Sequence, residues 1–206
     1  MSGNIAIGIQ DFSTIVQGNY FYIDKTPFIK EWWDCGDSAT LITRPRRFGK
    51  TLTMSMVEQF FSIDYAGRSD LFEHLAIWKE EKYRELQGTY PVISLSFARI
   101  KERDYEKTKQ KMCEVLRNIY IKFCYIKDSE KLTDADRAYY ERMLEENIKE
   151  TDATSSLYQL SDFLYRYYGK KVIILLDEYD TPMQEAFVDG YWAVSYTHLR
   201  AHETTL

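Results

Sequence analysis

An apolar run that ends in two carboxylates constrains the fold of this chain more than any other feature. Residues 172–176 read Val-Ile-Ile-Leu-Leu, and Asp177 and Glu178 follow directly. Five consecutive apolar residues bounded by a polar turn predict a β-strand buried on both faces, which is typical of parallel sheets covered by helices.

Further elements are expected on both sides of this strand. A turn at Gly18-Asn19 separates a predicted strand near residue 12 from a helix, for which Thr26 and Pro27 are the N-cap and the first residue. The remaining expected elements are a short strand at 39–43, a helix from Lys50, a strand at 91–97, and helices at 102–126, 133–148 and 155–168. Strands that alternate with helices predict an α/β domain with a parallel sheet.

Composition indicates a globular chain that stays outside membranes. The 206 residues are 45% hydrophobic, 29% charged and 16% aromatic, with a formal charge of −5, which gives no overall attraction to nucleic acid. Three widely spaced cysteines predict a reduced, cytoplasmic protein. We see no signal peptide and no apolar run of the roughly 20 residues that a membrane span needs.

A basic loop after the 39–43 segment resembles half of a phosphate-binding loop. Gly49, Lys50 and Thr51 match the end of the pattern G-x-x-x-x-G-K-[ST], whereas Arg44 stands at its first glycine. In such a loop Gly49 lets backbone N–H groups approach phosphate oxygens, Lys50 binds the β- and γ-phosphates, and Thr51 ligates Mg²⁺. The alternative is an exposed basic turn.

The carboxylates after the 172–176 strand supply the other half of the expected site. Ligands in open α/β sheets bind at the carboxyl ends of strands, so Asp177 is expected to hold Mg²⁺ through water. Glu178 is expected to orient and deprotonate the attacking water. The alternative is a pair of solvated carboxylates, but two motifs in the right order, each at a strand end, favour the site.

Three strings of residues together resemble a known family. Residues 22–29 (YIDKTPFI), 44–51 (RPRRFGKT) and 176–182 (LDEYDTP) are similar to the AAA-ATPase-like family of bacterial P-loop proteins, over about residues 8 to 192. These proteins are often followed by a nuclease-like domain of the PD-(D/E)XK type. The resemblance implies that Arg44 is a normal variant of the loop and not a defect. The implied nucleotide-binding residues are Arg44, Pro45, Arg46, Arg47, Phe48, Gly49, Lys50 and Thr51.

Several charged residues keep two interpretations. Arg46 and Arg47 bind phosphate or a nucleic-acid backbone, or form salt bridges at the loop rim, and Arg47 is favoured for phosphate because it is nearer to Lys50. Asp24 and Lys25 lie near the nucleotide, or their segment caps a helix. Asp180 supports the metal or, as we slightly favour, caps a turn.

The resemblance also implies a sheet of the additional-strand type, with order 5-1-4-3-2, which is incomplete here. Residues 194–206 resemble translated adapter sequence, so we interpret them as a non-native tail and do not read His198 and His202 as metal ligands. Residues 1–193 are then a partial P-loop ATPase domain, the N-terminal fragment of a longer protein. We expect the fragment to bind nucleotide weakly and to be inactive.

The expected function is therefore ATP binding and Mg²⁺-dependent ATP hydrolysis by the intact parent protein. The alternative is a nucleotide-gated binding module that regulates a nuclease-like domain or another partner without turnover. A third interpretation is a nucleic-acid binder that uses the basic residues 44–50. ATP and Mg²⁺ are the expected cofactors. Nucleic acid is a further candidate partner of the parent protein, through the nuclease-like domain, and the sequence does not define an oligomeric state.

Overall fold

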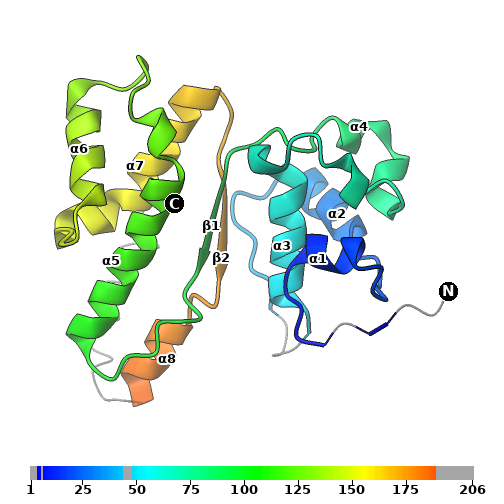
Figure 1. The fold of residues 1–206 in the computed structure, drawn as a ribbon, viewed down its shortest axis with the longest axis horizontal. Helices are drawn as coiled ribbons and strands as arrows, with labels where there is room; N and C mark the ends of the chain where they lie inside the picture. The colour runs from blue at the N-terminus through cyan, green and yellow to red at the C-terminus, as the bar shows by residue number, and fades with distance from the viewer. Residues whose placement is uncertain (1–3, 6, 44–47, 189–206) are drawn as a thin grey trace. The chain divides into compact units, whose positions relative to one another are not determined.

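The computed structural model describes residues 4–5, 7–43 and 48–188, and it divides the chain into two compact units (Figure 1). The N-terminal unit comprises residues 1–92 and the C-terminal unit residues 93–206. Each unit has its own set of buried apolar side chains.

Helices build the N-terminal unit, with α3 at its centre. Its elements are α1 (Phe12–Gln17), α2 (Pro27–Cys35), α3 (Lys50–Phe61), the 3-10 helices η1 (Ile63–Tyr65), η2 (Ser69–Leu71) and η3 (Ala76–Lys79), and α4 (Glu81–Arg84). Phe60 of α3 contacts Phe61 and Phe72 edge to face, with ring centroids 5.0 and 5.1 Å apart. Phe12 of α1 stacks on Phe72 at 5.1 Å, so aromatic rings join α1 to the central helix.

The first element is a helix, so the strand predicted near residue 12 is wrong. The carboxylate of Asp11 accepts the backbone N–H of Thr14 at 2.7 Å and caps the start of α1. Phe12 and Ile15, three residues apart, are its buried residues, and this is helical spacing. The packing of these two side chains and the Asp11 cap therefore make this segment a helix and not a strand.

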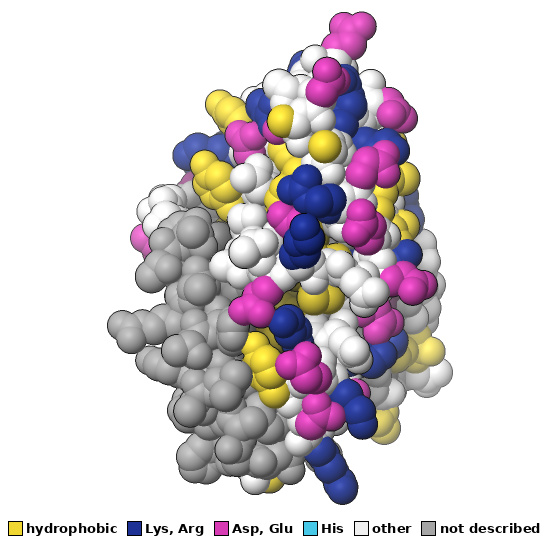
Figure 2. Space-filling view, turned by 90° about the vertical axis from the view of Figure 1, so that its left-hand side faces the viewer, with side chains coloured by type: hydrophobic (Ala, Val, Ile, Leu, Met, Phe, Trp, Pro, Cys, Tyr) yellow, Lys and Arg dark blue, Asp and Glu magenta, His cyan; other side chains and the backbone are white. Residues whose placement is uncertain are grey.

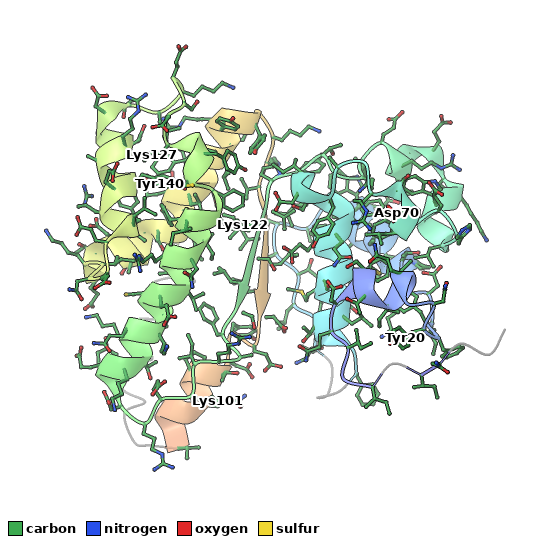
Figure 3. All side chains as sticks on the ribbon, viewed as in Figure 1. Tyr20, Asp70, Lys101, Lys122, Lys127 and Tyr140 are labelled. Carbon is green, nitrogen blue, oxygen red and sulfur yellow. The ribbon has the colours of Figure 1, made fainter. Side chains whose placement is uncertain are left out.

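The predicted turn at Gly18-Asn19 is confirmed. Asn19 has a positive φ of 50°, a conformation that asparagine tolerates better than most residues. A Cβ on Gly18 would lie 2.4 Å from the ring of Tyr20, which follows the turn (Figure 3). The turn thus needs glycine because the chain folds back closely on itself.

The starts of the next two helices are also confirmed. Thr26 and Pro27 are the N-cap and the first residue of α2, and α3 begins at Lys50. The predicted inner face of α3 is largely correct, since Met56, Val57 and Phe60 are buried and Leu52 is half-buried.

Residues 39–43 form no strand, so this part of the prediction is wrong. No described segment forms a β-ladder with them, and the side chain of Leu41 is 64% exposed. A strand is stabilised by its neighbours in a sheet, and apolar residues alone do not form one.

The C-terminal unit joins a small parallel sheet to helices. Its elements are β1 (Val92–Ser96, beginning at the boundary between the units), α5 (Tyr105–Lys122), the 3-10 helix η4 (Cys124–Ile126), α6 (Asp134–Leu144), α7 (Glu150–Tyr168), β2 (Ile173–Asp177) and α8 (Thr181–Val188). β1 pairs with β2, and just beyond β1 the backbone N–H of Phe97 donates to the carbonyl of Asp177 at 3.0 Å. Both strands and the α/β class with parallel pairing are confirmed.

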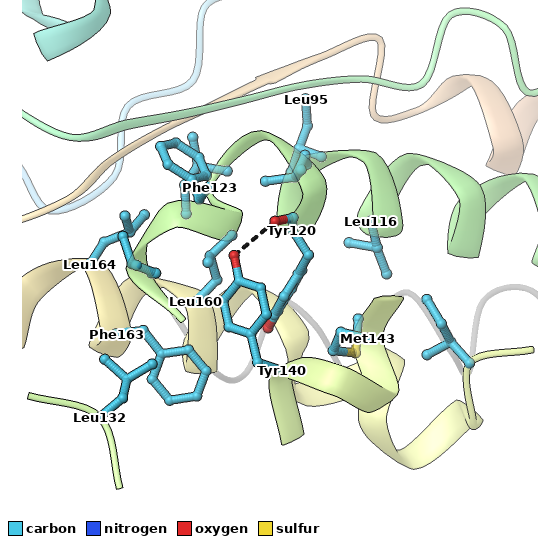
Figure 4. Close-up of a cluster of buried hydrophobic side chains, with 14 residues drawn as sticks. Leu95, Leu116, Tyr120, Phe123, Leu132, Tyr140, Met143, Leu160, Phe163 and Leu164 are labelled. Carbon is cyan, nitrogen blue, oxygen red and sulfur yellow. Dashed lines mark hydrogen bonds between the residues drawn. The ribbon is translucent and has the colours of Figure 1, made fainter. Parts of the chain in front are cut away.

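The core of this unit lies between the strands and helices α5, α6 and α7 (Figure 4). Leu95 of β1, Leu116 of α5 and Phe163 of α7 all belong to it. Two buried phenols donate to backbone carbonyls at 2.8 Å, Tyr140 to that of Tyr120 and Tyr120 to that of Ser156. Those hydrogen bonds let large polar rings fill an apolar core.

The helices follow the predicted order, with shifted ends. A capping box between Thr133 and Asp136 starts α6, and Gly169 ends α7 in the left-handed conformation, with φ 66°. Ion pairs such as Lys109 with Glu150, at 2.7 Å, join different helices. Figure 2 shows side chains of both charges interspersed on one face of the molecule.

β2 is buried mainly through one face, so the prediction of two buried faces is wrong. Ile173 and Leu175 are buried, whereas Ile174 and Leu176 are only half-buried. Within this unit α5, α6 and α7 all lie on the same side of the two strands (Figure 1). A single layer of helices can bury only alternate residues of a strand completely.

Candidate functional site

The Gly-Lys-Thr sequence stands at the N-terminus of α3. Gly49 is the N-cap, with φ 74° and ψ 28°, and its carbonyl accepts the backbone N–H and the hydroxyl of Thr53, both at 2.9 Å. Lys50 and Thr51 form the start of the first turn and are half-buried. The N-cap residue is a glycine and offers no side chain to cap this helix end, where the backbone N–H groups and the positive end of the helix dipole favour an anion.

The rest of the predicted loop divides into two parts. Phe48 is described, and its side chain is 62% exposed. Arg44, Pro45, Arg46 and Arg47 lie outside the described residues.

Asp24 has a structural role beside α2, although its carboxylate accepts no N–H of that helix itself. Its Oδ1 accepts the backbone N–H and the hydroxyl of Thr26, at 2.8 and 2.7 Å, immediately before α2. Its Oδ2 accepts the N–H of Ala76 at 2.7 Å, at the start of η3. Both oxygens therefore hold backbone segments together.

Lys25, in contrast, reaches the phosphate-type loop. Its Nζ lies 2.8 Å from the point where a Cβ on Gly49 would stand, and among the described residues beyond the chain neighbours no other atom lies within 4 Å of that point. No carboxylate of the described residues forms an ion pair with this ammonium. The structure thus brings Lys25 to Gly49 although 24 positions separate them in the sequence.

Tyr22 fixes the backbone of this segment against α3. Its hydroxyl donates to the sulfur of Met56 at 3.3 Å and accepts the backbone N–H of Lys25 at 3.2 Å. Its ring contacts that of Phe12 edge to face, with centroids 5.5 Å apart. Burial raises the pKa of Tyr22 to about 12, so the phenol stays neutral and keeps its proton for the sulfur.

The two predicted carboxylates stand at the end of β2, in the C-terminal unit. Asp177 is the last residue of the strand, and both it and Glu178 are half-buried. Glu178 has a positive φ of 53°, which is uncommon for a residue with a Cβ and concentrates at functional sites. Its carbonyl accepts the N–H of Thr181 at 3.0 Å, and Thr181 starts α8. The site therefore has a strand–tight turn–helix geometry.

Asp180 interacts within the same turn. Its Oδ2 accepts the side-chain amide of Gln184 at 2.5 Å, and its carbonyl accepts the backbone N–H of that residue at 2.9 Å. These contacts place Asp180 at the beginning of α8 and involve no backbone N–H on its carboxylate, so its cap role stays a prediction.

Oxygen ligands at the predicted metal residues fit a hard cation. A threonine hydroxyl at Thr51 and a carboxylate at Asp177 are the donor types that Mg²⁺ prefers. Within the described part of the chain, His, Cys, Asp and Glu side chains form no group of three or more suited to a metal ion. Either residue alone would leave the other positions around a magnesium ion to further ligands such as nucleotide phosphates and water.

None of the described helices is long and apolar enough to cross a membrane.

One comparison with known proteins identifies a family. A family model described as "Predicted AAA-ATPase" matches residues 6–202. A protein of Azotobacter chroococcum mcd 1, titled "Uncharacterized protein in vnfD 5'region", is 28% identical over 180 residues, 87% of this chain. The matched part covers 29% of that relative's length. No solved structure matches the chain.

Proposed function

This chain belongs to the AAA-ATPase-like family, and we propose that it binds ATP and Mg²⁺ for hydrolysis by the intact protein. One observation carries the proposal. Gly49 adopts a left-handed conformation as the N-cap of α3, so Lys50 and Thr51 begin a helix whose N-cap residue has no side chain. This geometry supports a phosphate cradle, because backbone N–H groups and the helix dipole both favour an anion there.

Each residue of the site then has a defined task. Lys50 holds the β- and γ-phosphates, and Gly49 allows the backbone to approach them. Thr51 and Asp177 would hold Mg²⁺, which when bound neutralises charge on the phosphates. Glu178 would orient the attacking water and accept its proton. Its unusual φ supports a role beyond packing, since an ordinary surface glutamate has no reason to adopt that conformation.

The sheet order 5-1-4-3-2 is also part of the proposal. The parallel pair of β1 and β2 is compatible with the adjacent strands 2 and 3 of that order, with Asp177 on strand 3. In this order segment 39–43, which forms no strand, stands at the position of strand 1, before the phosphate-type loop.

The nucleotide-gated module remains the second candidate, and Glu178→Gln separates the two. Nucleotide binding is measured by calorimetry and phosphate release by the intact protein. Loss of phosphate release with unchanged ATP affinity in the Glu178→Gln variant supports hydrolysis. An unaltered protein that binds ATP without releasing phosphate supports the module. DNA binding that falls steeply with salt and ignores nucleotide would instead favour the nucleic-acid interpretation.

Lys50→Ala tests the site itself. Removing the ammonium is expected to abolish measurable ATP binding by the complete 206-residue chain, because the phosphates lose their charged partner. Equal affinity in the variant and the unaltered chain would overturn the phosphate cradle.

A further inference from the structure

We infer that Lys25 is a second phosphate-binding cation of this site, contributed from outside the loop, and that its partner is the polyphosphate of the bound nucleotide. The inference rests on the proposed function, because it assigns one more residue to the same site. It starts from the approach of Lys25 to Gly49, the glycine that caps α3.

The Lys25 ammonium lies close to the loop. A Cβ on Gly49 would stand 2.8 Å from the Lys25 Nζ, a distance that real Cβ atoms essentially never show. Glycine at this position has two effects. It permits φ 74°, and its missing Cβ leaves room for the ammonium. The Lys25 Nζ therefore lies against the backbone whose N–H groups are to receive phosphate oxygens.

Several contacts keep the Lys25 backbone in this place. Asp24 before it binds Thr26 and Ala76, and the hydroxyl of Thr26 in turn accepts the N–H of Ile77 at 3.1 Å. Tyr22 holds the Lys25 N–H and contacts α3 through Met56. Lys25 thus projects from an anchored turn, so no backbone segment has to become ordered when its side chain meets a ligand.

The electrostatic setting of Lys25 calls for an anion. The N-terminus of α3 carries a partial positive charge, and Lys50 stands on its first turn, so a second ammonium is repelled there. Two other lysines of this unit have acidic partners, since Lys30 pairs with Glu80 at 2.5 Å and Lys82 pairs with Asp34 at 2.7 Å. No described carboxylate does this for Lys25. A polyphosphate at the cradle would satisfy all three positive groups together.

Calorimetry on the complete 206-residue chain tests the inference with two probes, MgATP and inorganic tripolyphosphate. Lys25→Gln is expected to lower the affinity for each probe by about tenfold, since a charge-assisted hydrogen bond is lost. Lys30→Gln, in which the neighbouring paired lysine is changed, is the matched control and is expected to leave both affinities within about twofold. The difference in affinity between the unaltered chain and Lys25→Gln should become smaller as the salt concentration is raised, because exposed charges are screened.

The outcomes separate this inference from the proposed function. Loss of binding in Lys50→Ala with an unchanged affinity in Lys25→Gln overturns the role of Lys25 alone. If the unaltered chain binds neither MgATP nor tripolyphosphate, both the proposed function and the role of Lys25 are overturned. A merely structural role predicts a lower unfolding midpoint of the ligand-free Lys25→Gln variant, whereas the ligand role predicts an unchanged or higher one. Lys25→Met, which keeps the aliphatic stem, replaces the glutamine variant if that fails to fold.

Discussion

The carboxylate of Asp24 accepts the backbone N–H of Ala76 at 2.7 Å, across 52 positions of sequence. Its other oxygen accepts two hydrogen bonds from Thr26, so one side chain ties the start of α2 to η3. The side chain of the next residue, Lys25, reaches Gly49. Adjacent residues thus have separate tasks, one holding the fold and one facing the candidate site.

Asp24→Asn is expected to lower the free energy of unfolding by about 2 kcal/mol. An amide offers a single acceptor oxygen, so either Ala76 or Thr26 loses its charged partner and a donor is left unpaired. Urea unfolding measures the loss. Asp37→Asn, at an exposed aspartate of the following loop, is the control and should change stability by less than about 0.5 kcal/mol. Equal stability of the two variants would contradict the bridging role.

Gly49→Ala and Gly36→Ala form a matched pair. Both glycines have positive φ, 74° and 66°, so alanine is expected to destabilise each site by about 1 kcal/mol. Only the Cβ at residue 49 meets another group, the Lys25 ammonium, which is mobile enough to move aside. Similar losses of stability are therefore expected, with weaker ATP binding by Gly49→Ala alone. Tight binding by that variant would argue against contact between nucleotide and this loop.

The positive φ of Glu178 predicts an unusual response to glycine. Glu178→Gly relieves the strain and should be at least as stable as Glu178→Gln, although glycine has the greater entropy when unfolded. At Glu141, exposed within α6, the glycine variant is expected to be about 1 kcal/mol less stable than the glutamine variant. Thermal unfolding of the four variants measures this. If the glycine variant were less stable than the glutamine variant by the same amount at both positions, the backbone of Glu178 would be unstrained.

Acid should weaken the C-terminal unit through Asp136. A hydrogen bond from Arg166 is the main cause that lowers the pKa of Asp136 to about 2, and burial partly opposes it. A folded pKa below the unfolded value of about 3.9 means that the stabilisation is present above pH 4 and is lost as pH falls toward 2.

Urea unfolding between pH 4.5 and pH 2 measures this effect. Between these pH values the unaltered protein should lose more unfolding free energy than Asp136→Asn does. After allowance for solvent screening, the difference should be about 1–2 kcal/mol. Asp134→Asn, at an exposed aspartate in the same first turn, is the control. An unchanged pH dependence in Asp136→Asn would rule out the Arg166 contact as its origin.

Local rules explain the elements that the sequence predicted correctly. Thr26-Pro27 starts α2 and Gly169 ends α7, because caps and breakers act within a few residues of the chain. The apolar runs 91–97 and 172–176 also predicted β1 and β2 correctly, and these two strands pair with each other. The positions of Lys50 on a helix start and of Asp177 at a strand end were likewise evident from spacing alone.

The sequence by itself thus determined the α/β class, the order of most elements and the two motifs of the candidate site. Tertiary structure decided the rest, because it depends on neighbours remote in sequence. Segment 39–43 forms no strand without a partner to pair with, and packing against α3 favoured a helix at α1. Nothing local distinguishes Asp24 from Lys25 as the residue that reaches the loop. That choice follows from the hydrogen bonds to Ala76 and from Gly49, where the missing Cβ leaves room for an ammonium.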